Sequence, residues 1–123
     1  MNKEDLDLLI AAAAATDDIL NYTITDSGIF VETGSTRGAS GYYWNPLEDD
    51  AIAFRLMVKL YMGVSVPVMR EARVDVITFT THSVNAIEVD KNGDRAAATR
   101  RAIVRVAAEI GRNKLKEKED NQA

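Results

Sequence analysis

His82 is the only histidine of the chain, and the sequence contains no cysteine. The absence of thiols excludes cysteine nucleophiles, disulfide bonds and zinc sites built from thiolates. A histidine base needs a nucleophile and an orienting group brought to it by the fold, and no motif around His82 indicates either. None of the acidic residues has metal-ligand spacing with it. We therefore predict a protein that is not an enzyme and that holds no metal or cofactor.

A glycine-rich segment, Gly34–Gly41, lies just upstream of a predicted helix and could cradle an anion with its backbone amides. It lacks the Gly-Lys-Ser/Thr ending of a P-loop, so a flexible connector is the favoured interpretation. In the alternative, Arg37 contacts the anion and Tyr42 stacks on a base or nucleotide ring. We expect Tyr43 and Trp44 to anchor the loop against the core, because aromatic side chains bury large apolar areas.

Three arginines of the last predicted helix, Arg101, Arg105 and Arg112, fall within a narrow arc of its surface. Such a basic stripe could contact phosphate groups. Glu109 is spaced to pair with Arg105 and Arg112, which weakens the stripe as a phosphate-binding surface. A solvated helix face is the favoured interpretation, and a nucleotide or nucleic-acid contact through these arginines stays an alternative.

Length and composition bound the class of protein. A chain of 123 residues fits one domain, and its hydrophobic and charged fractions, 46% and 28%, are typical of a globular fold. No apolar run approaches the roughly 20 residues of a membrane span, and the first residues lack the pattern of a secretory signal. We expect a cytoplasmic protein. Its net charge of −4 argues against a dedicated nucleic-acid binder.

Helical periodicity predicts three helices. They are expected at about residues 3–15, from Asn45 to Met62, and from Asp94 to Arg112. The second begins with Asn45 as its side-chain cap, Pro46 in the first turn and Glu48 completing a capping box. Residues 113–123 carry mostly charged and polar side chains, so we expect a disordered tail after a single domain of residues 1–112.

The second predicted helix is apolar on two sides. The side expected to face the core consists of Leu47, Ala51, Phe54, Val58 and Tyr61, with Met57 beside them. Ile52 and Leu56 project away from that side, as they would on a helix that meets a partner. We therefore predict a contact with another protein or with a second copy at Ile52 and Leu56, with Arg55 and Lys59 as its polar rim.

Strand patterns occur in two regions. Asn21–Glu32 predicts a hairpin that turns at Asp26-Ser27-Gly28. Three further strands are predicted at Val64–Met69, Val74–Thr80 and Val84–Val89. Pro67 cannot donate to a neighbouring strand, which places the first of these three at a sheet edge or bulge. A change of phase at Val76-Ile77 indicates a bulge or a strand covered by helices on both faces.

Two segments resemble a known family: YWNPLEDDAIAFRLMVKL at Tyr43–Leu60, and GDRAAATRRAIVRVAAEIGR at Gly93–Arg112. Both are similar to the phage ABA sandwich domain family, small proteins of tailed phages and prophages, and the likeness extends more loosely over residues 3–112. The resemblance implies a three-layer α/β/α sandwich, with helices on both faces of a largely antiparallel sheet, and the segments above predict three helices and about five strands. It implies no activity and no site residue. The loop at Thr33–Gly41 and the charged tail depart from the family pattern.

These features predict an α+β domain that acts by binding. We expect a phage or prophage accessory protein that binds a host or phage protein in the bacterial cytoplasm, and inhibition of a host defence system is one form this could take. The charge is uneven, with acidic residues dominating the first 50 positions and basic residues outnumbering them afterwards, which suits a protein contact. The alternative is a nucleotide or nucleic-acid binding module that uses the Gly/Ser loop and the arginine stripe.

Overall fold

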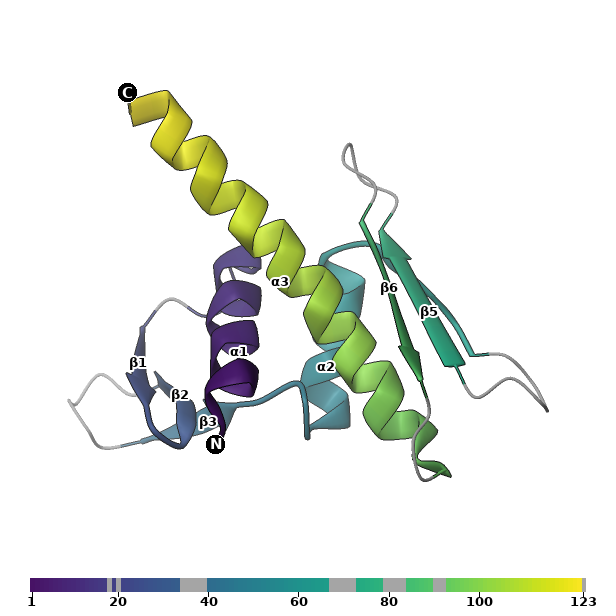
Figure 1. Cartoon of the computed structure of the whole chain (residues 1–123). Coiled ribbons are helices and arrows are strands. Elements are labelled where there is room, and N and C mark those ends of the chain that lie inside the picture. The colour runs from purple at the N-terminus through teal and green to yellow at the C-terminus, as the bar shows by residue number, and fades with distance from the viewer. Residues whose placement is uncertain are drawn as a thin grey trace.

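The computed structural model describes residues 1–17, 19, 21–33, 40–66, 73–78, 84–89 and 93–122. Over these residues three helices and six strands follow one another (Figure 1). Their order is α1 (Lys3–Ala15), β1 (Tyr22–Thr25), β2 (Gly28–Glu32), β3 (Gly41–Trp44), α2 (Asp50–Lys59), β4 (Met62–Ser65), β5 (Arg73–Thr78), β6 (Asn85–Val89) and α3 (Arg95–Gln122). His82, Pro67 and Arg37, which the sequence singled out, lie outside the described residues.

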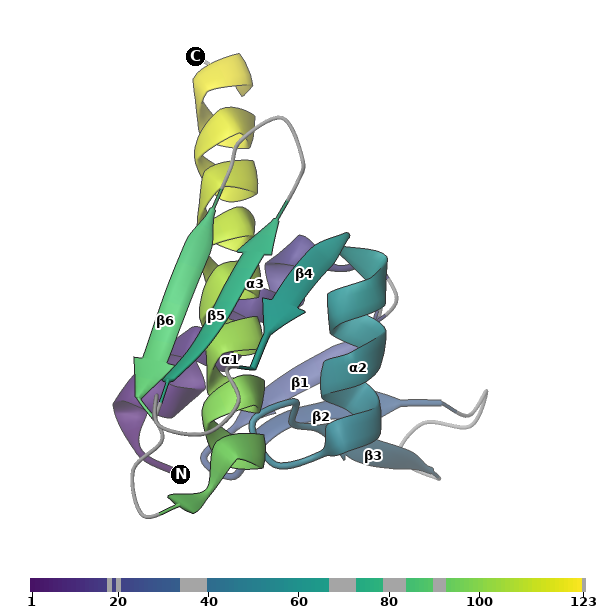
Figure 2. The same cartoon turned by 90° about the vertical axis from the view of Figure 1, so that its right-hand side faces the viewer.

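The described strands form two antiparallel sheets of three strands each, in the orders β1-β2-β3 and β4-β5-β6. The α+β class and the three helices are as expected, but the prediction of one sheet with about five strands is wrong. In Figure 1, α1 lies between the first sheet and α3, and the second sheet lies on the other side of α3. The turn of view in Figure 2 shows the same order, with α2 beside β4. α3 is therefore the central element of the fold.

The core forms where α3 meets its neighbours. Its largest fully buried side chains include Leu9, Ile29, Val74, Val76, Val104 and Val106. Small residues let α1 and α3 approach closely, because Ala11, Ala12 and Ala15 of α1 and Gly111 of α3 are all buried. The close packing of α1 against α3 contributes many dispersion contacts, and it leaves no room for larger side chains where the two helices cross.

The first sheet begins as the predicted hairpin. β1 and β2 pair from Tyr22 opposite Val31 to Thr25 opposite Gly28, and Gly28 adopts φ 130°, a conformation that favours glycine. The third strand, β3, was not expected from sequence. It buries Trp44, as predicted, but Tyr43 points to the opposite face and is exposed, so the prediction that Tyr43 anchors the loop in the core is wrong. Its ring instead meets the ring of Phe30 edge-on, at 5.3 Å between centroids.

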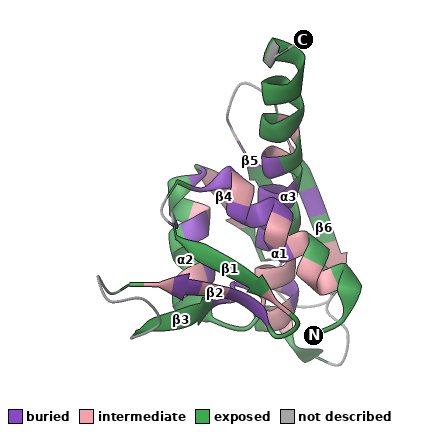
Figure 3. Cartoon of the chain, turned by 90° about the vertical axis from the view of Figure 1, so that its left-hand side faces the viewer, coloured by how far each residue is buried: buried purple, intermediate pink, exposed green. Residues whose placement is uncertain are grey.

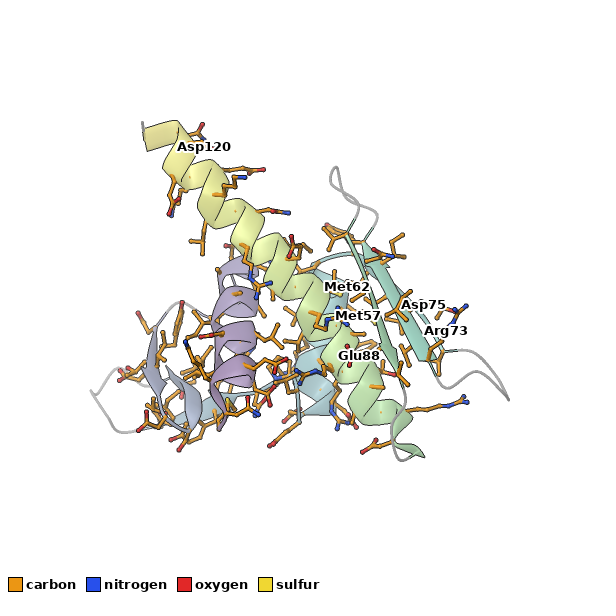
Figure 4. All side chains as sticks on the ribbon, viewed as in Figure 1. Met57, Met62, Arg73, Asp75, Glu88 and Asp120 are labelled. Atoms are coloured by element: carbon orange, nitrogen blue, oxygen red, sulfur yellow. The ribbon has the colours of Figure 1, made fainter. Side chains whose placement is uncertain are left out.

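The second sheet presents one buried face and one open face. Along β5 the side chains of Val74, Val76 and Thr78 are buried, while Ile77 is exposed. Arg73 and Asp75 lie on the outer face, away from α3 (Figure 4). The alternation is regular, so the predicted phase change with helices on both faces is wrong. β4 lies at the edge of this sheet, one of the two placements predicted for the strand expected at Val64–Met69, but it spans Met62–Ser65 and ends before Pro67.

Three helix boundaries differ from the sequence prediction, and one of them is the end of α2, expected at Met62 and found at Lys59. α2 begins at Asp50 with Asp49 as its cap, because the Asp49 side chain accepts from the amide of Ile52 at 3.1 Å, whereas Asn45 caps only a preceding turn by accepting from the amide of Leu47. α3 does not end at Arg112 but continues to Gln122. Its last turns project beyond the rest of the molecule and are exposed, as the green ribbon of Figure 3 shows.

Candidate functional site

The exposed side of α2 carries large apolar side chains with no covering element among the described residues. Phe54 is 61% exposed, Val58 56% and Tyr61, just past the end of the helix, 74%. Phe54 and Val58 are four positions apart and share one side of the helix, and Tyr61 follows just past its end. We call Phe54, Val58 and Tyr61 the α2 surface. Patches of this kind on a folded chain mark interaction sites.

α2 buries the side that the sequence assigned to a partner. Leu56 is buried, with Ala53 and Leu60 beside it, and Ile52 packs against the core. The expectation that Phe54, Val58 and Tyr61 face the core is therefore wrong, and Leu56 is not accessible to a partner. Arg55 and Lys59, the expected polar rim, are exposed. Around the helix, Arg55 and Lys59 lie between the exposed row of Phe54 and Val58 and the row that contains Ile52. Helical spacing alone therefore did not show which of the two apolar rows is buried.

Contacts from α3 and β5 fix this orientation of α2. Arg100 of α3 donates from Nε to the carbonyl of Leu47 at 2.8 Å and pairs through Nη1 with Asp50 at 2.8 Å, which holds the start of the helix. At the other end the buried Thr78 hydroxyl donates to the carbonyl of Leu60 at 3.2 Å. These contacts accompany the burial of Ala53, Leu56 and Leu60 in the core, and together they leave the α2 surface facing outward.

Tyr61 has an unusual backbone. Its φ of 56° makes it the one residue other than glycine with a positive φ in the described chain. The left-handed region costs a side chain with a Cβ about 1–2 kcal/mol. The Leu60 carbonyl just before it is held by Thr78, and β4 begins just after it at Met62. The chain therefore turns within one residue, and the Tyr61 side chain is directed outward.

An apolar pocket of about 330 Å³ opens next to Tyr61. Leu60 and Tyr61 line it from the end of α2, Val84 from the start of β6 and Ile110 from α3. Lys59, Lys114, Asp17 and Glu117 stand around these apolar groups. This volume lies at the lower end of ligand pockets, which run from about 300 to 1,000 Å³, so it accommodates one bulky side chain or a small apolar group.

The arginine stripe lines a second cavity, a groove of about 870 Å³ between α1, β6 and the first half of α3. Arg101, Arg105 and Arg112 all line it, so the structure brings the three predicted residues together. Carboxylates from α1, from β6 and from the residue before α3 line the same groove. They are Glu4, Asp7, Glu88 and Asp94.

Ion pairs within the protein occupy the arginines of this groove. Arg101 pairs with Asp5 at 2.8 Å and with Glu4 at 3.2 Å, and Arg105 pairs with Glu88, which points toward α3 (Figure 4). The hydrogen bond to Asp5 raises the pKa of Arg101, against the opposing effect of partial burial. Arg112 pairs with Glu109 at 3.5 Å, the spacing noted in the sequence. A phosphate would have to displace these carboxylates.

Tyr42 does not join the arginine groove. It lies on β3 and lines a cavity of about 260 Å³ with Trp44, Ile52 and Arg55. Arg37 lies outside the described residues. The other predicted anion contacts do not share one site, because the three arginines line the groove on α3 and Tyr42 lines a different cavity.

Within the described part of the chain, no three His, Cys, Asp or Glu side chains are grouped as metal ligands would be. The described helices include none with the length and apolar character needed to cross a membrane. Comparison of the sequence with protein-family models, with curated proteins and with solved structures found no match.

Proposed function

We propose that this protein acts by binding another protein through the α2 surface. The observation that carries the proposal is the reversed burial of α2: Ala53 and Leu56 face the core, while Phe54, Val58 and Tyr61 face solvent. Covering an exposed large apolar side chain contributes about 1.5–3 kcal/mol before ordering costs. Aromatic side chains are enriched at the centres of protein interfaces, and two of these three are aromatic.

The alternative of a nucleotide or nucleic-acid binding module has less support. The three arginines that would bind phosphate each have a carboxylate partner within the protein. A ligand phosphate would have to compete with these pairs, whereas Phe54, Val58 and Tyr61 offer a partner exposed apolar surface. We therefore favour protein binding.

The resemblance to the phage ABA sandwich domain family is the reason to expect a phage or host protein as the partner. In this proposal the protein is a phage or prophage accessory factor of the bacterial cytoplasm and is not an enzyme, and inhibition of a host defence system is one outcome of such binding. The three-layer sandwich that the same resemblance implies stays a prediction.

Site-specific photo-crosslinking in bacterial cells tests the proposal. A photoreactive phenylalanine analogue is placed at position 54 or 58, and at position 87 as the control, because Ile87 is also an exposed apolar residue but lies on the second sheet. We expect the same protein adduct from positions 54 and 58 and none from position 87. Adducts of equal yield from all three positions, or none at 54 and 58, would show that the α2 surface is not the binding site.

In a second step, the protein found in the adduct is purified and its affinity for this chain is measured. The variant Phe54→Glu, Val58→Glu should fold like the wild type, because both side chains are exposed, and should bind roughly tenfold or more weakly. The matched control, Ile87→Glu, should bind like the wild type. Unchanged affinity of the double variant would contradict the proposal.

A further inference from the structure

We infer that two copies of this chain pair through strand β1, so that their first sheets join into one antiparallel sheet around a twofold axis at Thr23. The inference goes beyond the proposed function and does not depend on it, because the α2 surface lies on another element. It combines three observations: the outward backbone groups of β1, the uncovered apolar side chains at the same positions, and the lack of charge along this edge.

The backbone of β1 has polar groups that point away from the first sheet. Asn21 and Glu32 form a hydrogen-bonded pair, because the amide of Glu32 donates to the carbonyl of Asn21 at 2.9 Å. Bonded pairs alternate along an antiparallel ladder, so Thr23 bonds to β2 while Tyr22 and Ile24 turn their amides and carbonyls outward. Among the described residues none bonds to these outward groups. A second extended backbone can satisfy them, because it presents amides and carbonyls at the same spacing.

The side chains at these two positions are apolar and uncovered. Tyr22 lies opposite Val31 in the register of β1 and β2. Ile24 lies opposite Ile29, and residues directly opposite each other project to the same face of a sheet. Val31 and Ile29 are buried, yet Tyr22 is 38% exposed and Ile24 49%, and Figure 3 shows β1 as exposed ribbon. The buried face of the first sheet therefore continues at β1 beyond the elements that cover it.

The other sheet edges are less suited to pairing with a strand. Along β6 the carbonyl of Ile87 accepts from Arg105 Nη1 at 3.0 Å, and Arg105 also pairs with Glu88. Charged side chains at an edge oppose its pairing with another strand. The edge strand β3 includes Gly41, which has no side chain to pack across an interface, and β4 lies beside α2 (Figure 2). β1, in contrast, contains no charged residue.

The edge of β1 is complementary to a second copy of itself. When Thr23 lies opposite the partner's Thr23, Tyr22 lies opposite the partner's Ile24, and the outward amides and carbonyls of both copies bond to each other. An aromatic side chain opposite a β-branched one and two opposed threonines are favourable cross-strand pairs. A second copy therefore supplies a matching strand for both the backbone and the side chains.

The short edge predicts a weak dimer. β1 has four residues, whereas a stable interface between folded proteins includes about 20–30 residues on each side. We therefore expect sedimentation equilibrium to show monomer and dimer together at protein concentrations between about 10 μM and 1 mM, the range of weak association.

A charge placed on the edge tests the dimer. Ile24→Lys puts like charges on the two pairing strands and should raise the dissociation constant roughly tenfold or more. The matched control is Ile87→Lys, because Ile87 is also half-exposed and lies on the edge strand β6. This control and Phe54→Glu should leave the dimer unchanged. A wild type that stays monomeric over the whole range, equal effects of the two lysine variants, or a dimer abolished by Phe54→Glu would overturn the inference.

Cysteine cross-linking tests the register and needs no charge at the edge. The chain has no cysteine, so each single-cysteine variant carries one thiol. In the inferred pairing the two copies of position 23 are opposite each other without hydrogen bonds, at about 4.5 Å between Cα atoms, within reach of a disulfide. Thr23→Cys should therefore form a covalent dimer with oxidised glutathione, while Ser27→Cys, exposed in the turn and far from the axis, should not. Equal yields from the two variants, or none from Thr23→Cys, would overturn the pairing even if Ile24→Lys fails to fold.

Discussion

Gly111 of α3 lies against the backbone of Ala11 in α1. A Cβ placed on Gly111 would lie 1.8 Å from the Ala11 carbonyl oxygen and 3.2 Å from the amide nitrogen of Ala15. Because these are backbone atoms, no side-chain rotation can relieve the overlap. The crossing of the two helices therefore depends on the absence of a side chain at position 111.

Gly111→Ala should lower the free energy of unfolding by about 1–3 kcal/mol, the usual cost of overpacking. The gain in helix propensity, about 1 kcal/mol, offsets only part of the strain. Chemical denaturation measures the difference. Asn121→Ala on the exposed part of α3 is the control and should change stability by less than about 0.5 kcal/mol. A more stable Gly111→Ala variant would mean that the helices lie further apart.

The cap of α2 can be located by comparing two substitutions. Asp49→Ala removes the acceptor of the Ile52 amide and should cost about 1 kcal/mol. Asn45→Ala leaves the backbone bonds to the Asn45 carbonyl in place and should cost less, about 0.5 kcal/mol. Asp49→Ser keeps a capping oxygen and serves as the control. The reverse order of costs in thermal or chemical unfolding would place the start of the helix at Asn45.

Lys114, in the part of α3 beyond Arg112, contacts the end of α1. Lys114 Nζ donates to the carbonyl of Ala15 at 2.9 Å, in the last turn of α1, where carbonyls lack helical partners and the helix dipole is negative. Lys114→Ala should cost about 0.5–1 kcal/mol, and Lys116→Ala, an exposed lysine on the same helix, should cost less than about 0.5 kcal/mol. Equal effects of the two substitutions would show that the Lys114 contact does not stabilise the fold.

Truncation of the chain tests the same region independently. Removal of residues 116–123 should leave the melting temperature nearly unchanged, because the described side chains there are exposed. Removal of residues 113–123 should lower it by a few degrees, as expected for a loss of about 1 kcal/mol in a domain of this size. A large loss from the shorter truncation would contradict this division.

The pair Arg101–Asp5 joins α3 to α1, and both side chains are about 30% exposed. A double-mutant cycle with Arg101→Ala and Asp5→Ala should give a coupling of about 1 kcal/mol, reduced by salt. The pKa of Arg101 is raised in the folded state, so its contribution is complete below the unfolded pKa and is lost only as pH rises through the folded one. We therefore expect no loss of this contribution between about pH 7 and 10. A coupling near zero would leave the pair without a role in stability.

Local patterns in the sequence were sufficient for most of the elements. Alternating apolar residues and a two-residue turn specify the β1–β2 hairpin, and the period of 3.6 residues specifies α1 and the first half of α3. These features depend on neighbours along the chain, which the sequence gives directly. The sequence did not predict the strand β3, because a segment of four residues, Gly41–Trp44, is too short to establish an alternation of apolar and polar side chains.

Only the tertiary structure decided which side of α2 is buried. The helix has two apolar sides, with Arg55 and Lys59 between them. The helical period predicts both sides but does not show which of them is buried. The choice between them comes from Arg100 and Thr78, which hold the two ends of the helix and are distant from it in sequence. The same holds for the arginine stripe, since its charge is offset by Asp5 and Glu88 from other elements. The sequence therefore placed the candidate site on the wrong side of α2, at Ile52 and Leu56 in place of Phe54 and Val58. Burial depends on contacts between elements, which periodicity does not report.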